Sequence, residues 1–150
     1  MRRKKNKFDK ILYIGSGLTI LFSVILVLYT MVSVLWPFEP VEYLNQPFPV
    51  LNPNKTVKPG DILEYNIKFC KHIDRPVNVY RELHDDHHIV SLVPIYSNFP
   101  TGCNDIVVDR TIIPYNIDPG EYELVLNVIM EMNPFKTHTS TVRTEKFTIE

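Results

Sequence analysis

Residues 61–70 read DILEYNIKFC, and the alternation within this stretch decides the fold class. The apolar side chains would share one face of a strand: Leu63, Tyr65, Ile67 and Phe69. The polar side chains and a cysteine would share the other: Glu64, Asn66, Lys68 and Cys70. Because period-two alternation is typical of a strand with one buried face, we expect a half-buried strand here, beginning after a Pro59-Gly60 turn.

Similar patterns continue to the end of the chain, with turn residues between them. The further predicted strands are residues 76–83, 88–96 (interrupted by Pro94), 104–113, 121–132 and 139–149. In the 104–113 strand we expect Ile106, Val108 and Ile112 to face inward. No long helical periodicity follows Trp36. About six or seven short strands in one domain predict an all-β fold, an immunoglobulin-like antiparallel β-sandwich over residues 56–150.

An uncharged, apolar stretch runs from Ile11 to Trp36, upstream of this domain. About 20 apolar residues suffice to cross the hydrocarbon core of a bilayer, so we predict a transmembrane helix over residues 11–36. A cleaved signal peptide and a buried core helix are the alternatives. The apolar part of a signal peptide is usually shorter and ends at a small-residue cleavage site, a pattern that is missing here.

The charge distribution predicts the orientation of this helix. Residues 1–10 carry six basic side chains against one acidic side chain, Asp9. Positive charge favours the cytoplasmic side, so the predicted arrangement is a single-pass signal-anchor protein with a cytoplasmic basic tail and an extracytoplasmic C-terminal domain. The chain after Trp36 is mildly acidic, which argues against a nucleic-acid partner.

Residues 37–55 contain five prolines, at positions 37, 40, 47, 49 and 53. Proline fixes φ and lacks a backbone N–H, so we predict an extended linker that holds the domain away from the lipid headgroups. Val50 and Leu51 could still add a short edge strand. Asn54-Lys55-Thr56 is a glycosylation sequon, which matters only in a cell that glycosylates secreted proteins.

Cys70 ends the first predicted strand of the domain, and Cys103 precedes the fourth. In an immunoglobulin-like sandwich these strands are antiparallel neighbours. Both cysteines would then lie on the outer face of one sheet, so a disulfide is expected in an oxidising compartment. Two free thiols, or a zinc site completed by histidines, are the alternatives.

Residues 84–88 read HDDHH, a composition that suggests a metal site. Consecutive residues of an extended chain point apart, so we assign no metal ligands and no cofactor. If this loop bound zinc or copper, the candidate ligands would be His84, Asp86 and His88. A solvated turn and a pH-sensitive contact surface, in which His87 would also take part, are the other interpretations.

A second candidate surface lies in residues 93–102, VPIYSNFPTG. Ile95, Tyr96 and Phe99 occur there among prolines, and apolar side chains in loops often mark interfaces. The alternative is that they cap one end of the core. No nucleophile motif or glycine-rich phosphate loop occurs, so we identify no catalytic residues and predict that the protein is not an enzyme.

Two motifs, TVKPGDILEYNIKF at residues 56–69 and PGEYELVLNVIM at residues 119–130, resemble cell-surface sandwich domains of the CARDB and fibronectin-III-like type. Cys70 departs from that pattern, in which a polar residue more often ends the opening strand. The resemblance implies an adhesion, spacing or assembly module.

Together, the patterns and the resemblance predict a membrane-anchored structural or interaction protein. It would act as a small subunit of an envelope, membrane or virion-associated complex. The expected partners are the lipid bilayer, other membrane or envelope proteins and further copies of the same chain. A metal-binding domain and a filament subunit are the alternative functions.

Overall fold

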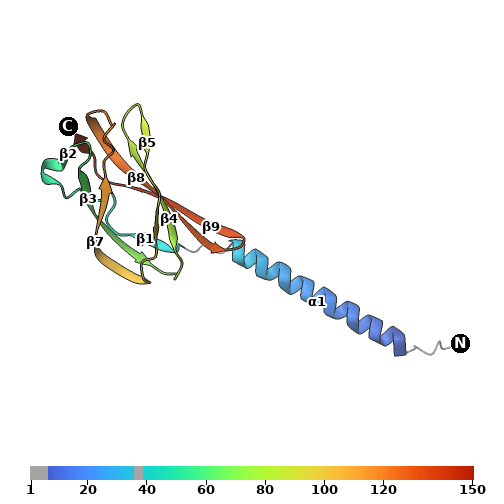
Figure 1. Cartoon of the computed structure of the whole chain (residues 1–150). Coiled ribbons are helices and arrows are strands. Elements are labelled where there is room, and N and C mark those ends of the chain that lie inside the picture. The colour runs from blue at the N-terminus through green and yellow to red at the C-terminus, as the bar shows by residue number, and fades with distance from the viewer. Residues whose placement is uncertain (1–6, 36–38) are drawn as a thin grey trace. The chain divides into compact units, whose positions relative to one another are not determined.

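The computed structural model describes residues 7–35 and 39–150, except for the side chains of residues 7–12, 105 and 106. The chain divides into two compact units, one before and one after the boundary between residues 37 and 38. The first contains a helix and the second contains strands (Figure 1).

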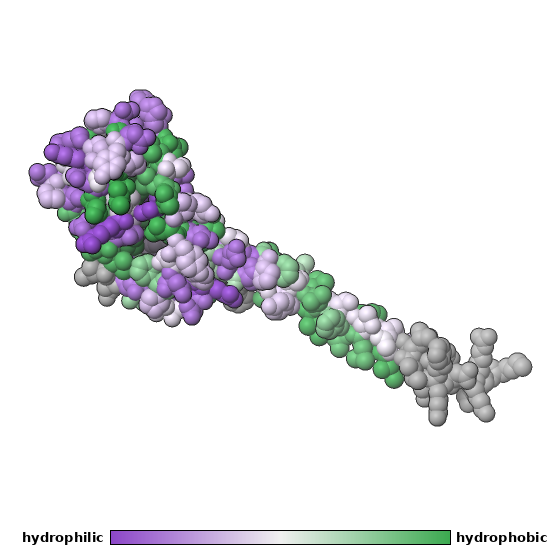
Figure 2. Space-filling model, viewed as in Figure 1, coloured by the Kyte–Doolittle hydropathy of each residue, from purple (hydrophilic) through white to green (hydrophobic). Residues whose placement is uncertain are grey.

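The helix α1, Lys7–Leu35, is long and apolar enough to cross a membrane. Its segment Tyr13–Leu35 has a mean hydropathy of 2.5 and is almost entirely exposed, and Figure 2 shows apolar side chains along the visible face. The apolar side chains are spread around the helix and do not gather on one side. A helix that is hydrophobic all round would be expected inside a protein core or a bilayer. The predicted start at Ile11 falls inside α1. Trp36, and residues 1–6 of the basic tail, lie outside the described residues.

Over its described residues, 39–150, the second unit contains ten strands and one short 3-10 helix, η1, Pro53–Lys55. The strands are β1 Val41–Tyr43, β2 Thr56–Val57, β3 Ile62–Lys71, β4 Val77–His84, β5 Ile89–Ser91, β6 Ile95–Ser97, β7 Gly102–Ile112, β8 Gly120–Asn133, β9 Lys136–Arg143 and β10 Phe147–Ile149. Two predicted strands are each divided in two. The prediction for residues 88–96 becomes β5 and β6, because Pro94 cannot donate to a ladder. The prediction for residues 139–149 becomes β9 and β10.

The strands form two sheets that enclose one core. The smaller sheet has the order β1-β3-β7. The larger has the order β2-β10-β8-β4-β5, with β6 also pairing with β4 and β9 with β8. The predicted inner face of β3 is confirmed, because Leu63, Tyr65 and Phe69 are buried and pack in the same cluster as Leu124 and Leu126 of the larger sheet. The fold is therefore an all-β sandwich.

The turn before β3 depends on Gly60, whose φ is +89°. A Cβ atom placed there would lie 2.3 Å from the ring of Tyr115, so only glycine fits without a shift of that ring. The backbone N–H of Gly60 donates to the Ile113 carbonyl at 2.9 Å. This bond ties the turn to the end of the β7 strand.

The predicted phase of β7 is wrong for Val108 and Ile112. Both are exposed, whereas the neighbouring Thr111 is buried opposite Leu63. The third residue of that prediction, Ile106, lies outside the described side chains. A bulge explains the error, because the pairing shifts from Ile67↔Val107 to Phe69↔Asn104, so that residues 105 and 106 oppose Lys68 alone. One extra residue reverses the alternation between the two parts of β7.

The Pro-rich segment also differs from its prediction as a linker. Residues 41–43 form β1 against β3, and Val50 makes a bridge with Tyr65. Between these contacts, Phe48 crosses to the larger sheet: its N–H donates to the Arg143 carbonyl at 2.9 Å, and its own carbonyl accepts from the Glu145 N–H at 2.8 Å. The segment therefore pairs with both sheets. Its prolines do not prevent this, because some backbone groups of an edge segment have no strand partner, and proline is tolerated at those positions.

Candidate functional site

The HDDHH stretch forms the end of β4 and the turn to β5. The Asp85 carboxylate accepts hydrogen bonds from the backbone N–H groups of His87, at 2.6 Å, and of His88. These two bonds lower the pKa of Asp85, mainly through the His87 N–H. Asp85 therefore holds the turn closed, with Oδ1 engaged by both backbone N–H groups and Oδ2 near the His88 ring.

The histidines of this turn have separate partners. His84 Nε2 lies 2.9 Å from Glu82 Oε2, and His88 Nδ1 lies 3.4 Å from Asp85 Oδ2. Within the described residues, no group of three or more His, Cys, Asp or Glu side chains is arranged to hold a metal ion. The geometry thus gives no support to His84, Asp86 and His88 as one set of ligands.

The three predicted interaction residues lie in different environments. Tyr96 is 69% exposed on β6, and Phe99 is 37% exposed in the following loop. Ile95 is partly buried against the core. The Phe99 ring packs edge-on against Phe69, with ring centroids 5.3 Å apart. Tyr96 alone of the three is mainly exposed to solvent, while Ile95 and Phe99 close one end of the core.

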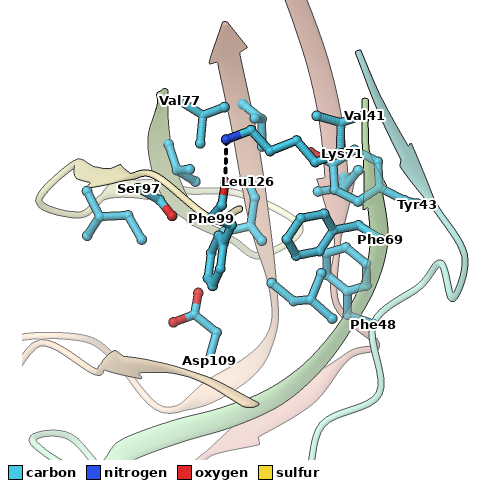
Figure 3. A pocket seen from close by; sticks show the side chains of 15 residues that line it. Val41, Tyr43, Phe48, Phe69, Lys71, Val77, Ser97, Phe99, Asp109 and Leu126 are labelled. Atoms are coloured by element: carbon cyan, nitrogen blue, oxygen red, sulfur yellow. Dashed lines mark hydrogen bonds between the residues drawn. The ribbon is translucent and has the colours of Figure 1, made fainter. Parts of the chain in front are cut away.

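An apolar cavity of about 70 Å³ lies between the two sheets behind Phe99 (Figure 3). Its walls include Phe69 and Ile67 of β3 and Val77 and Val79 of β4. Two charged residues, Lys71 and Asp109, also line it. Figure 3 shows the Lys71 side chain across one end of the cavity and Asp109 at the other.

Lys71 is 2% exposed, although it is a lysine on the inner face of a sandwich. Its Nζ donates to the Phe99 carbonyl at 2.6 Å. Among the described side chains, no carboxylate forms an ion pair with it. An ammonium has three donors and rarely becomes fully buried without a counter-ion, so this arrangement needs a physical explanation.

Asp109 belongs to a polar network that continues away from the cavity. It accepts a hydrogen bond from the Tyr65 hydroxyl at 2.8 Å. The Thr111 hydroxyl accepts a bond from Arg81 Nη1 at 3.1 Å and lies 3.5 Å from the Tyr65 hydroxyl. Burial, and then the Asp109 charge, raise the pKa of Tyr65 far above its ordinary value. The Tyr65 hydroxyl therefore stays protonated, which suits a structural donor.

Cys70 and Cys103 form a disulfide between directly opposite positions of β3 and β7. The predicted pairing therefore agrees with the structure, but part of the reasoning for it does not. If Ile112 faced inward as predicted, its neighbour Thr111 would share the outer face with Cys103, but Thr111 is buried. The bulge at residues 105 and 106 then returns Cys103 to the same face as Cys70.

Sequence reasoning missed Lys71 and Asp109. The alternation of β3 had a signal for Lys71, because the inward positions 63, 65, 67 and 69 continue to residue 71. Asp109 could be found only after the β7 phase had been corrected, and that depends on a bulge without a sequence signature.

Comparison with known proteins provides little information beyond this geometry. No family model matches the chain, and no curated protein matches it. One similar solved structure is described as the C-terminal domain of wzt, with 10% sequence identity and a TM-score of 0.46. The alignment covers 77% of this chain and 75% of that one. The resemblance to CARDB and fibronectin-III-like domains stays a prediction at the family level.

Proposed function

We propose that the protein is a single-pass membrane protein that presents its β-sandwich outside the cytoplasm to other proteins of the membrane or envelope. The observation that carries the proposal is the order of the chain, in which an uncharged, mainly apolar helical segment, Tyr13–Leu35, precedes a disulfide-linked β-domain. Disulfides persist in oxidising compartments, which agrees with the orientation that the basic tail predicts.

The polar side chains of α1 support membrane insertion. Thr19 Oγ1 donates to the Gly15 carbonyl at 3.0 Å, and Ser23 Oγ donates to the Thr19 carbonyl at 2.9 Å. Thr30 Oγ1 donates to the Val27 carbonyl at 2.9 Å. Hydrocarbon offers no hydrogen-bond partners, so an unsatisfied hydroxyl group is costly to bury in a bilayer. Hydroxyl groups that donate to carbonyls of their own helix avoid most of that cost.

An immunoglobulin-like topology is the finer interpretation of the fold that we favour. The smaller sheet has the order expected for strands A, B and E, and the larger places β8 between β4 and the β9–β10 edge, as in strands C, F and G. The parallel pairing of β2 with β10 agrees with a first strand that changes sheets.

Two surface features favour an interaction role. β7 is the last strand of the smaller sheet, so among the described strands none pairs with its outer edge. Beside this edge, Ile112 is 66% exposed and lies opposite the exposed Ile62. An unpaired strand edge beside apolar side chains favours association with another chain, including a second copy of this one. The role that we propose is not enzymatic.

Site-specific photo-crosslinking in the native membrane tests this role. A photoreactive residue replaces Ile112 or Tyr96 in the full chain, and the exposed Lys58, just before the Pro59-Gly60 turn, serves as the matched control position. We expect discrete adducts of one size from Ile112 or Tyr96 and none from Lys58. Recovery of the monomer alone from all three positions would exclude the interaction role.

A protease-protection experiment tests the orientation separately. A tag placed after Glu150 is expected to be digested in intact cells, or in spheroplasts of a walled cell, while a tag before Met1 stays protected. Protection of the C-terminal tag in cells whose surface proteins are cleaved would reverse the proposed topology.

A further inference from the structure

The cavity behind Phe99 combines three properties that protein cores rarely combine. It is lined almost entirely by apolar side chains, it lies next to the partly exposed Phe99, and it contains the buried ammonium of Lys71. The Phe99 carbonyl satisfies one of the three donors of that ammonium. Within the described residues this positive charge has a single neutral acceptor and is therefore poorly solvated, so a nearby anion would be bound strongly.

We infer that this cavity is a binding site for a small monocarboxylate with an apolar tail or ring. The carboxylate would accept hydrogen bonds from Lys71 Nζ, and the apolar part would lie between Phe69 and the β4 valines, Val77 and Val79. This inference goes beyond the proposed interaction role and does not depend on it.

Charge and size define the ligand class. Asp109 lies at the opposite end of the cavity from Lys71, so a second negative charge on the ligand would be repelled (Figure 3). This disfavours a phosphate dianion. The cavity volume of about 70 Å³ excludes a complete lipid, and a short chain would fit only as the loop of Phe99 moves outward.

The loop that contains Phe99 would act as the cover of the site. The Phe99 ring packs on Phe69, and its carbonyl is held by Lys71 at 2.6 Å. An entering carboxylate would compete with that carbonyl for the ammonium. Binding is therefore expected to move the loop at residues 98–101 away from Lys71.

Methyl NMR of the full chain in phosphatidylcholine nanodiscs tests the inference without any mutation. Hexanoate, 1-hexanol and hexylamine have the same tail and differ in charge, and empty nanodiscs correct for partition into the lipid. Hexanoate is expected to shift the methyl signals of Val77 and Val79 with an affinity roughly tenfold or more above that of hexanol, as for a charge-assisted hydrogen bond. Hexylamine should bind most weakly. Equal affinities for the three compounds, or no shift of these methyl signals, would overturn the inference.

Substitution of the lysine then tests the charge itself. Lys71→Met keeps the length of the side chain and is expected to remove the preference for hexanoate while hexanol still binds. Lys58→Met, which removes an exposed lysine, should leave the preference unchanged, and Lys71→Arg should retain it. A Lys71→Met protein that folds and still prefers hexanoate would refute the assigned role of Lys71. If that variant does not fold, the comparison of the three compounds on the unmodified protein still decides the question.

A last arm distinguishes a membrane source from a soluble one. Oleic acid is added to the nanodisc at a few mole per cent before the hexanoate titration. Competition between the two supports the carboxylate site and assigns its ligand to the acyl acids of the bilayer, of which only the carboxylate and the first few carbons would enter the cavity. Hexanoate binding that oleic acid does not change supports the same site with a soluble ligand.

Discussion

Two segments of the chain have roles opposite to those that their compositions suggest. The Pro-rich segment before β2 was predicted to be a linker, yet it pairs with both sheets and contributes the fully buried Phe48. The HDDHH stretch suggested a metal site, yet its Asp85 closes a local turn. The difference teaches that composition shows which bonds a segment could make, whereas packing decides which of them it does make.

The largest expected effect comes from breaking the packing of the first segment. Phe48 is 0% exposed, so Phe48→Ala should leave a cavity and lower the free energy of unfolding by about 3–5 kcal/mol. Urea denaturation of the full chain in micelles, followed by circular dichroism, measures this loss. Phe135→Ala is the matched control, because Phe135 is mainly exposed. Equal decreases in the free energy of unfolding for the two variants would show that the segment acts as a linker and does not contribute to the core.

The disulfide sharpens the comparison, because Glu42 of this segment lies opposite Cys70. Cys70 and Cys103 are separated by 33 positions, so replacing both with alanine should lower the free energy of unfolding by about 3–4 kcal/mol in the chain-entropy model. The same urea denaturation experiment measures this decrease in the free energy of unfolding. Reduction of the unmodified protein should reproduce most of the loss. A double variant as stable as the parent would mean that the bond contributes nothing to stability.

Side-chain hydrogen bonds from the same segment should contribute less. Asn45 Oδ1 accepts the Lys68 N–H at 2.7 Å, and its Nδ2 donates to the Asn66 carbonyl at 3.0 Å. Asn45→Ala leaves both backbone groups without these partners and should lower the free energy of unfolding by about 1–2 kcal/mol. Asn116→Ala, at an exposed position, should change it by less than about 0.5 kcal/mol. If Asn45→Ala changes the free energy of unfolding as little as the control does, water replaces both hydrogen bonds of the Asn45 amide.

In the second segment, the prediction concerns pH. The pKa of Asp85 is lowered in the folded protein, so the carboxylate stabilises the turn above its ordinary pKa, and this contribution is lost as pH falls through the lower, folded value. The part of the His87 and His88 amide NMR shifts that depends on the Asp85 carboxylate should therefore have its midpoint below the ordinary aspartate pKa of about 3.9. Asp85→Asn keeps an acceptor but cannot ionise, so its amide signals should not follow that titration. A midpoint above that ordinary value, in the component that Asp85→Asn removes, would contradict the assigned bonds.

The smallest effect is expected from the histidines themselves. Replacing His84, His87 and His88 together with glutamine should change the free energy of unfolding at pH 7 by less than about 1 kcal/mol, as is usual for surface substitutions. Added zinc should leave the melting temperature of the parent unchanged. A zinc-dependent rise that the triple variant lacks would restore the metal-binding alternative.

Much of the fold was predictable because one face of most strands is buried. The alternation in β3 and β8 located both strands within one or two residues, and Pro94 marked the division of β5 from β6. The phase of β7 could not be predicted, since a bulge is a property of the paired strands and leaves no mark on either sequence. The candidate site was even harder to predict from the sequence. The importance of Lys71 follows from a burial that depends on both sheets and on the loop of Phe99.

The pairing of β1 with β3 also has a mechanical consequence. In this antiparallel pair Val41, the first residue of β1, lies opposite Lys71, the last residue of β3. Tension that reaches the domain through the chain before Val41 would separate β1 from β3 from this end. The hydrogen bonds between the two strands would break one after another. The next pair along, Glu42↔Cys70, lies beside the disulfide, and the buried Phe48 follows seven residues after Val41. A small force would thus release β1 and extend the chain by a few residues, and a larger force would be needed to extract Phe48. The release of β1 would limit the tension that reaches the rest of the domain.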